Sequence, residues 1–359
     1  MFWWQYVTIF SITFVLTVFL TDLVRRLALR YKILDYPKEA RKIHNKKIPL
    51  LGGLAIFCSF FLMSFVFKEQ LLLGDLNINH WLGVFIGASL LMLGGFLDDK
   101  YNLKSWQQLI WPVLAIVIVI AGGVEIDKIS APGGSPIFLK QITILASITL
   151  SEVFLFFWLL AMTYTTKLLD GLDGLVSGLT VIGSLVIFLF TITTKYYQAD
   201  IGLAALILAA ASAGFLLLNW HPAKIFLGEG GSLLLGFLLG VLAIISGGKI
   251  AITLLVLALP ILDLVWTIFR RLYNGKNPMK AADKKHLHHR FLALGWGQRR
   301  AVLTFYAFAV IFGLSGLFLQ SQGKFFLLIV LFLIMVSLVL FFSWWERKQK
   351  KNMENDYNK

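Results

Sequence analysis

Long apolar runs separated by short polar segments dominate the chain and predict a helical membrane protein. Each run is close to the ~20 residues that an α-helix needs to cross a hydrocarbon core about 30 Å thick. We expect eleven membrane spans, at residues 3–21, 50–67, 81–97, 107–123, 150–168, 174–194, 201–219, 231–247, 250–269, 301–319 and 325–344. The chain has 359 residues, 58% of them hydrophobic, and no polar segment long enough for a separate soluble domain. We therefore predict one all-α polytopic domain over residues 1–345.

Basic residues divide unevenly between the two sides of this arrangement. Of the 33 Lys and Arg residues, 27 lie in the segments on one side and six in those on the other. Because cytoplasmic loops carry an excess of Lys and Arg, we expect the N-terminus outside and the C-terminus in the cytoplasm. The same bias explains most of the net charge of +14, so the charge does not indicate a nucleic-acid partner.

Two segments outside the spans have their own predicted structure. The external segment 124–149 contains the turn sequence APGGSP between short β-branched runs, which predicts a small hairpin. The basic tail, residues 346–359, is expected to be a solvated, disordered end.

Three acidic clusters interrupt or end apolar runs, and all three fall on the cytoplasmic side. They are Asp98–Asp99 in GGFLDDKYN, Asp170 with Asp173 in LLDGLDGL, and Glu229 in FLGEGGS. Carboxylates at membrane depth are costly and usually functional, and oxygen ligands suit Mg²⁺ with phosphate. We therefore expect the clusters to converge on one magnesium and phosphate site. Taken singly, the first pair could be a solvated helix end, and DGLDG could be a helix cap.

Basic residues near these clusters are candidates for binding an anion. They are Lys46 and Lys47 in the first cytoplasmic loop, and His286, His288, His289 and Arg290 in the loop 270–300. The histidine run lacks a Cys or Glu to complete a tetrahedral zinc site, so a pyrophosphate site is favoured over zinc. Positive-inside bias and an interfacial basic loop remain alternatives. Asp263, inside the ninth span, is either functional or paired with Lys167 or an Arg.

The ordered motifs resemble those of the polyprenyl-phosphate N-acetylhexosamine-1-phosphate transferases, a branch of glycosyltransferase family 4. The resemblance covers most of the chain and rests on RKIHNKKIPLLGG, GGFLDDKYN, LLDGLDGL, NWHPAKIFLGEGGS, DLVWTIFRRLYNGKNP and ADKKHLHHR. It implies transfer of a sugar 1-phosphate from a UDP-HexNAc to polyprenyl phosphate, with Mg²⁺, or alternatively Mn²⁺, as cofactor. The products would be UMP and a polyprenyl-pyrophosphoryl sugar that starts a cell-envelope glycan.

The resemblance also implies a setting and a donor. The protein would lie in the bacterial plasma membrane, with a cytoplasmic active site, and could form a homodimer. The form HLHHR looks more like the N-acetylglucosamine branch than the pentapeptide-carrying translocases. Alternatives are a phospho-MurNAc-pentapeptide transferase, a polyprenyl-phosphate binder without turnover, and an ion-coupled transporter.

Residue roles follow from the resemblance position by position. Asp98 or Asp99 would orient or deprotonate the lipid phosphate, Glu229 would ligate the metal, and Asp170 and Asp173 would border the metal and the uridine. Phe226 would stack on uracil, Asn219 would shape the nucleotide pocket, and the histidines with Arg290 would hold the pyrophosphate or the sugar. Lys46 or Lys47 would contact phosphate.

The chain departs from the family pattern at two of these motifs. The family usually has Asp where this chain has Glu229, and Asn where it has Lys167. Both changes bear on rate and donor choice, but neither removes the negative charge of the site.

Overall fold

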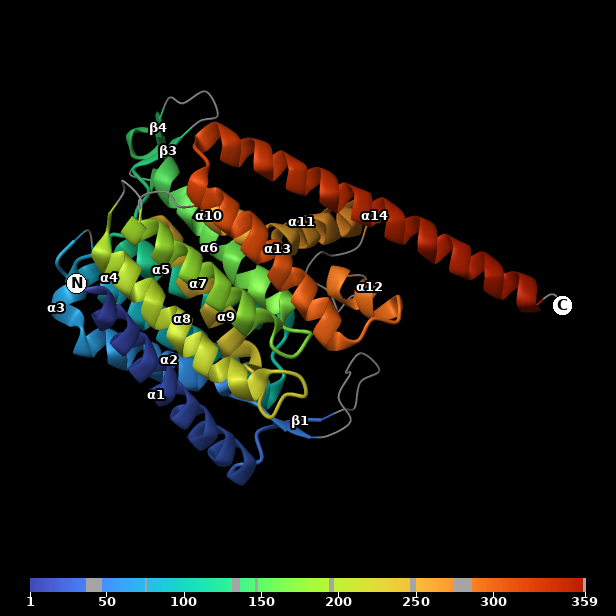
Figure 1. Ribbon diagram of the computed structural model, residues 1–359, viewed down its shortest axis with the longest axis horizontal. Helices are drawn as coiled ribbons and strands as arrows, with labels where there is room; N and C mark the ends of the chain where they lie inside the picture. The colour runs from blue at the N-terminus through green and yellow to red at the C-terminus, as the bar shows by residue number, and fades with distance from the viewer. Residues whose placement is uncertain are drawn as a thin grey trace.

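The computed structural model (Figure 1) describes residues 1–36, 47–74, 76–130, 136–145, 148–193, 197–245, 250–273, 275 and 286–357. Long helices form most of this chain. They are α1 (Trp3–Arg30), α2 (Gly52–Val66), α4 (Ile78–Tyr101), α5 (Ser105–Ala121), α6 (Leu150–Leu169), α7 (Leu175–Thr193), α8 (Ala199–Asn219), α9 (Gly228–Ile245), α10 (Ile250–Val256), α11 (Ala258–Tyr273), α13 (Gln298–Phe318) and α14 (Ser321–Tyr357). Two helices are short, α3 (Lys68–Leu71) and α12 (Leu287–Ala293).

The described helices confirm an all-α polytopic membrane protein. Among them, eight are long and apolar enough to cross a membrane, or nine if α10 and α11 count as one bent span. The shorter apolar helices α2 and α5 occupy two further expected spans. The ninth expected span is bent by 82° between α10 and α11. Pro260 lies in the first turn of α11, where its missing N–H leaves no helical hydrogen bond unmade.

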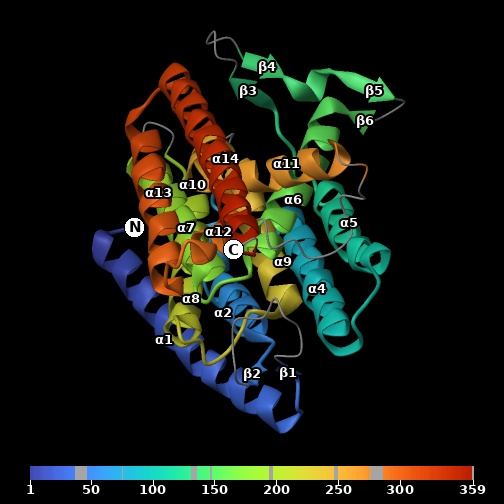
Figure 2. The same ribbon diagram turned by 90° about the vertical axis from the view of Figure 1, so that its right-hand side faces the viewer.

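Small antiparallel ladders lie at the two ends of the helical bundle. The predicted hairpin segment forms β3 (Lys128–Ser130) with β4 (Pro136–Phe138), and β5 (Thr143–Leu145) with β6 (Ile148–Thr149). At the opposite end, β1 (Leu34–Asp35) pairs with β2 (Ile48–Pro49). Figure 2 shows β3–β6 above the bundle and β1–β2 below it.

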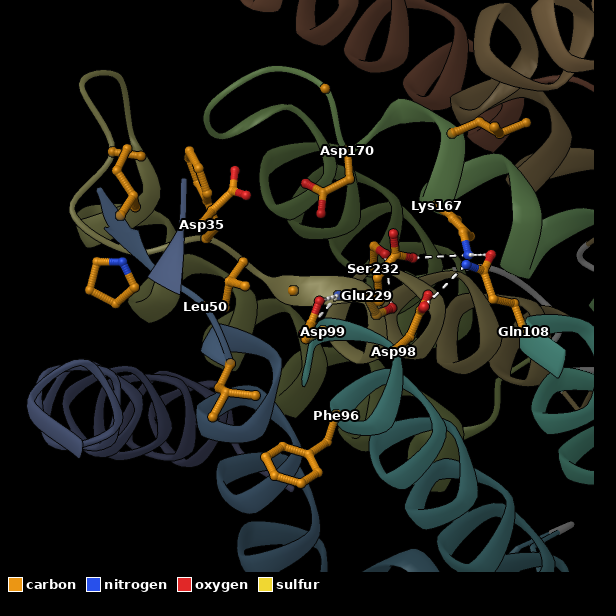
Figure 3. Close-up of a pocket in the computed structure, with 18 of the residues that line it drawn as sticks. Asp35, Leu50, Phe96, Asp98, Asp99, Gln108, Lys167, Asp170, Glu229 and Ser232 are labelled. Atoms are coloured by element: carbon orange, nitrogen blue, oxygen red, sulfur yellow. Dashed lines mark hydrogen bonds and ion pairs between the residues drawn. The ribbon is translucent and has the colours of Figure 1, made fainter. Parts of the chain in front are cut away.

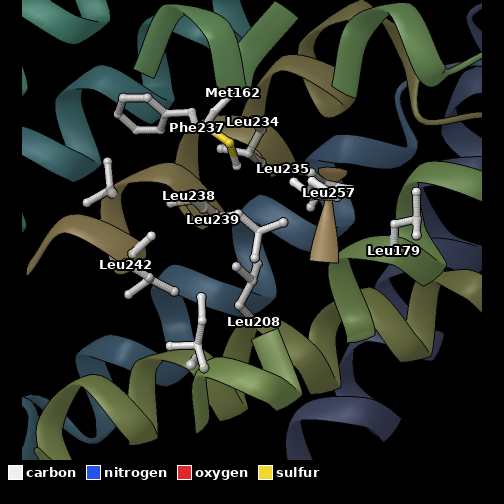
Figure 4. Close-up of a cluster of buried hydrophobic side chains, with 14 of the residues drawn as sticks. Met162, Leu179, Leu208, Leu234, Leu235, Phe237, Leu238, Leu239, Leu242 and Leu257 are labelled. Carbon is white, nitrogen blue, oxygen red and sulfur yellow. The ribbon is translucent and has the colours of Figure 1, made fainter. Parts of the chain in front are cut away.

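Helix α9 forms the centre of the bundle. In its most apolar stretch 89% of the residues are buried, against 22% for α14 at the periphery. Its leucines interlock with Met162 of α6, Leu179 of α7 and Leu208 of α8 (Figure 4). Other helices therefore enclose α9 on nearly all sides, which fixes the position of its first turn.

Glycine pairs bring α9 against its neighbours at that turn. A Cβ on Gly95 of α4 would lie 2.0 Å from the backbone nitrogen of Gly230, and one on Gly53 of α2 would lie 2.1 Å from Cα of Gly231. Small residues permit such close backbone approach between membrane helices. The GEGGS sequence is therefore held between α2 and α4.

The basic tail differs from expectation, because α14 continues as a helix to Tyr357. Disorder is therefore wrong for residues 346–357. The segment ERKQKKNMEND has no Gly or Pro and is rich in good helix formers, so nothing in it stops a helix already begun. Figure 1 shows α14 extending away from the bundle toward the C-terminus. The division of the chain at residue 345 stays a prediction.

Candidate active site

Asp99, near the end of α4, lies at the N-terminus of α9 and accepts hydrogen bonds from its first turn. The backbone N–H of Glu229 donates to Asp99 Oδ1 at 3.2 Å and to Oδ2 at 3.3 Å. The preceding Gly228 has φ +75°, and a Cβ there would lie 2.6 Å from Asp99 Oδ2. A carboxylate at a helix N-terminus satisfies an orphan donor and favours the helix dipole. Asp99 therefore caps α9 from a neighbouring helix while it lines the site.

Asp98 holds the turn between α4 and α5. Its Oδ1 accepts from the backbone N–H of Leu103 at 2.8 Å and from Gln108 Nε2 at 3.1 Å. Its side chain is buried. The adjacent carboxylates thus have different partners.

Lys167 and Glu229, the two residues that depart from the family pattern, contact each other. Lys167 Nζ lies 3.0 Å from Glu229 Oε2 and donates to Gln108 Oε1, also at 3.0 Å. Figure 3 shows this connection running from Asp98 through Gln108 and Lys167 to Glu229. A cation at position 167 therefore lies against the carboxylate expected to ligate the metal.

Asp170 follows the last turn of α6 and lies open to the same space. Among the described residues its carboxylate has no hydrogen bond or ion pair. Although the carboxylate touches water, the surrounding protein removes much of its hydration. That loss, together with the negative charges of Glu229 and Asp99, raises the pKa of Asp170 well above its ordinary value of 3.8. An added cation would relieve this repulsion.

Asp173 has protein partners of its own. His221 Nδ1 lies 2.7 Å from Asp173 Oδ2, and the backbone N–H of Ala223 donates to the same oxygen at 3.1 Å. His221, in the NWHPAK motif, lines the cleft and was missed from the sequence. The feature of the sequence that could have indicated this position is the neighbouring Pro222, whose ring restricts the backbone.

Asn219 lies beneath the site and does not line it. Its Oδ1 accepts from the N–H of Gly174 at 3.1 Å and from Ser177 Oγ at 2.9 Å, while its Nδ2 donates to Ile225 O at 3.0 Å. It therefore joins the DGLDG turn to the loop before α9. Its expected role in the nucleotide pocket becomes one of shaping the wall from behind.

Phe226 lies on the wall of the cleft, and two backbone hydrogen bonds fix its loop. Its N–H donates to Pro49 O at 2.9 Å, and its carbonyl accepts from the N–H of Gly52 at 2.9 Å. Lys47, also on the cleft wall, has its Nζ 5.0 Å from the centre of the Tyr36 ring. Lys46 lies outside the described residues. Asp35 lines this end of the cleft and was missed from the sequence.

The histidine segment is anchored by Asp263. His286 Nδ1 lies 2.8 Å from Asp263 Oδ2, and the N–H of Leu287 donates to Asp263 Oδ1 at 3.2 Å. Of the two expectations for Asp263, pairing with Lys167 or an Arg is therefore wrong, because its carboxylate contacts α12, and a functional role stays a prediction.

His288 stacks between its neighbours and faces the acidic turn. Its ring lies parallel to that of His286 at 5.8 Å and 4.2 Å from that of His289. Burial, followed by the charges of His289 and His286, lowers the pKa of His288 well below 6.5. A Cβ on Gly171 would lie 2.7 Å from His288 Nε2. This histidine is therefore a neutral hydrogen-bonding group beside the DGLDG turn.

Arg290 points away from these histidines. Its guanidinium lies 5.6 Å from the centre of the Phe342 ring and its Nε 3.5 Å from Glu346 Oε1, both on α14. It does not line the cleft. The structure thus places it between α12 and α14, not with the groups expected to hold pyrophosphate.

One cleft of about 2480 Å³ joins the acidic clusters to the histidines. Of the sequence-predicted residues, it includes Lys47, Asp98, Asp99, Asp170, Asp173, Phe226, Glu229, His286, His288 and His289. The cleft continues along an apolar groove between α6 and α11. Its walls there include Phe157, Leu160, Ala161, Tyr164, Leu264, Val265 and Ile268. The cleft therefore contains both a polar region and an apolar groove.

The donor chemistry fits a hard divalent cation. In the part of the chain that the structure describes, no three His, Cys, Asp or Glu side chains form a complete metal site. Mg²⁺ commonly takes one or two carboxylates and completes its shell with water and substrate phosphate. Asp170, whose carboxylate has no partner among the described residues, and Glu229, whose partner is the flexible Lys167, could meet that need, while Asp173 is paired with His221.

Comparison with known proteins agrees with this geometry. Residues 81–247 match the family model described as glycosyl transferase family 4. A Bacillus subtilis (strain 168) protein named "Probable undecaprenyl-phosphate N-acetylglucosaminyl 1-phosphate transferase" is 32% identical over 336 residues, covering 92% of this chain and 89% of the relative. The chain belongs to glycosyl transferase family 4.

Other members of the family are similar over comparable lengths. A Thermotoga maritima protein named "Undecaprenyl-phosphate alpha-N-acetylglucosaminyl 1-phosphate transferase" is 30% identical over 91% of this chain and 94% of its own. A Halalkalibacterium halodurans protein named "Phospho-N-acetylmuramoyl-pentapeptide-transferase" is also 30% identical, over 87% of this chain and 95% of its own. This family 4 chain is therefore a transferase, and the matched range 81–247 contains all five carboxylates of the acidic clusters.

Proposed function

We propose that the protein transfers N-acetylglucosamine 1-phosphate from UDP-N-acetylglucosamine to a polyprenyl phosphate, undecaprenyl phosphate in a bacterial plasma membrane. The observation that carries this proposal is the single cleft that joins a carboxylate-rich polar region to an apolar groove. The printed names of the Bacillus subtilis and Thermotoga maritima relatives support the same donor group and acceptor.

The groove between α6 and α11 suits the acceptor. Several of its side chains are strongly exposed, including Phe157 at 62% and Val265 at 56%. An isoprenoid chain would pack against this surface in place of membrane lipid, and the gain would come from closer van der Waals contact, since lipid tails are as apolar as these side chains. The phosphate head would then lie at the acidic end of the groove.

The polar region suits a uridine diphosphate sugar. Phe226 offers an aromatic face for the base, and a base stack is worth ~1–3 kcal/mol. The neutral imidazole of His288 can donate to or accept from the diphosphate or the sugar. Asp263 holds His286 so that its Nε2 is left for a ligand.

The reaction is a direct phosphoryl displacement. An oxygen of the lipid phosphate forms a bond to the β-phosphorus of the donor, while the bond from that phosphorus to the bridging oxygen breaks. UMP leaves with the bridging oxygen, and the sugar stays on the transferred phosphorus. No proton need be removed from a fully ionised lipid phosphate, whose second pKa is ~6. The role of Asp98 and Asp99 is therefore to hold the α4–α5 turn and the first turn of α9, and so to position the head group.

Asp170 and Glu229 are the residues that would hold a magnesium ion. When bound, it would offset the repulsion between the two phosphates and stabilise charge on the transferring group. Lys167 already supplies one positive charge beside Glu229. The excess of basic residues on this side of the bundle supports a cytoplasmic position for the site.

The test uses full-length protein reconstituted with undecaprenyl phosphate, Mg²⁺ and a panel of UDP-sugars. UMP release that requires both the lipid and UDP-N-acetylglucosamine is the expected result. Faster UMP release from UDP-MurNAc-pentapeptide would show that this donor, and not UDP-N-acetylglucosamine, is preferred. No UMP from any donor would contradict the transferase proposal.

A further inference from the structure

The ammonium group of Lys167 lies at the acidic end of the cleft, where two side chains hold it. The lysine side chain is 15% exposed, and its Nζ lies 3.0 Å from both Glu229 Oε2 and Gln108 Oε1. Gln108 is held in turn by Asp98 at 3.1 Å. The last turn of α6 thus delivers a cation directly to the first turn of α9 (Figure 3).

The ammonium group of Lys167 competes with a divalent cation for the carboxylate of Glu229. A metal that takes Glu229 must displace the ammonium or share its oxygen, because the two positive charges would lie within a few ångströms of each other. The nearby Asp170 has no such partner among the described residues and stays unneutralised. Of the two carboxylates expected to hold a metal, Asp170 therefore has no cationic partner among the described residues, whereas Glu229 is paired with Lys167.

The lysine can release Glu229 without leaving the cleft. Lysine carries a point charge with three donors on a flexible stem, and its bond to Gln108 does not depend on Glu229. After release, a phosphate oxygen of the donor would offer Lys167 a new anionic partner. Metal and diphosphate would then each favour the binding of the other.

We propose that Lys167 is an internal counter-ion of Glu229 that couples divalent-cation binding to binding of the donor diphosphate. The inference rests on the proposed function for its diphosphate half. Without donor, Lys167 neutralises Glu229 and weakens the affinity for a free cation. With donor, the cation takes Glu229 and Lys167 moves to the diphosphate, where it is a positioning residue.

Binding of Mn²⁺ to the full-length detergent-solubilised protein tests this without turnover. Electron paramagnetic resonance measures free Mn²⁺ with and without UDP-N-acetylglucosamine, in the absence of acceptor lipid. For the wild type, donor should tighten Mn²⁺ binding at least about tenfold, a coupling of ~1.4 kcal/mol. Lys167→Met should bind Mn²⁺ about tenfold more tightly than wild type without donor and lose most of the donor effect.

Two variants control for charge and folding. Lys104→Met removes the same charge from an exposed lysine outside the cleft and should leave Mn²⁺ binding unchanged. Lys167→Arg keeps a cation at the position and should remain close to wild type, so it reports on the charge if Lys167→Met is poorly folded.

Three outcomes are decisive. Mn²⁺ affinity in Lys167→Met that equals or falls below the wild-type value would overturn the counter-ion role. A donor effect of full size in Lys167→Met would overturn the coupling. If the transferase proposal itself is wrong, UDP-N-acetylglucosamine should lower free Mn²⁺ in every variant only as much as it does without protein, while Lys167→Met would still bind free Mn²⁺ more tightly.

Discussion

At the scale of single residues, Glu229 connects three features of the site. Its backbone N–H binds Asp99, its carboxylate binds Lys167, and it repels the neighbouring Asp170. The sequence identified Glu229 and Lys167 as departures from the family pattern, but not that their side chains contact each other. Pairing between α6 and α9 depends on how the helices pack, which no local pattern specifies.

Replacing Glu229 by Gln should abolish most magnesium-dependent turnover. The amide keeps the shape but loses the charge that would hold the metal, so we expect a loss of at least about 100-fold, at the upper end for metal-shell changes. UMP release measured across a Mg²⁺ titration checks this. Glu229→Asp should retain part of the activity, and full activity of Glu229→Gln at ordinary Mg²⁺ would refute a ligand role.

Asp263→Asn should impair donor use through His286. The amide can donate as well as accept, so it no longer fixes the imidazole with its Nδ1–H toward position 263. We expect a loss of about 10–100-fold, as for other outer partners of functional histidines, mainly in KM for the UDP-sugar. An unchanged KM with a lower unfolding temperature would show that Asp263 only holds α12 in place.

At the scale of elements, the first turn of α9 depends on a carboxylate from α4. The sequence predicts Asp99 at the cytoplasmic end of a span, and the family resemblance implies that it faces the lipid phosphate. The structure adds a capping role, because Gly228 turns the chain so that the N–H of Glu229 meets Asp99. Such a cap joins residues 130 positions apart and leaves no sequence signature.

Asp99→Ala should therefore destabilise the protein as well as slow it. Loss of a helix cap costs about 0.5–2 kcal/mol, which should appear as a lower unfolding temperature in detergent. Asp127→Ala, which removes an acid from the opposite end of the bundle, is the comparison variant. An unfolding temperature equal to wild type would argue that Asp99 acts on substrate alone.

The glycine contact between α4 and α9 should tolerate no larger side chain. Gly95→Ala would place Cβ 2.0 Å from the backbone of Gly230, and overpacking of this kind costs about 1–3 kcal/mol. Thermal unfolding and the yield of folded protein measure the effect. Gly297→Ala, with nothing within 4 Å of its Cβ, should be far milder; equal effects would contradict the tight packing.

At the scale of the whole molecule, the spans were predictable and the connections between them were not. Long apolar runs and the bias of basic residues fix helices and their order, which is why all eleven expected spans have helical counterparts. The bend before α11, the contact of Arg290 with α14 and the pairs Asp173–His221 and Asp263–His286 arise only from tertiary packing. The basic composition of the tail predicts disorder, whereas the helix continues because the segment contains good helix formers and no Gly or Pro.

The apolar groove should distinguish long acceptors from short ones. Ala161 lies on its α6 wall, so Ala161→Trp should fill part of the groove. We expect KM to rise at least about fivefold for undecaprenyl phosphate, the equivalent of ~1 kcal/mol, with little change for a water-soluble short-chain phosphate. Comparable losses for both acceptors would place the lipid chain elsewhere.

The most direct measurement follows the β-phosphorus of the donor. Reconstituted protein is given undecaprenyl phosphate, Mg²⁺ and UDP-N-acetylglucosamine labelled with ³²P at the β-position, and lipid and nucleotide fractions are separated. Transfer of sugar 1-phosphate predicts that the label moves to the lipid fraction as unlabelled UMP appears in equal amount. Label that remains with the nucleotide as UDP, or no movement of label at all, would contradict the account.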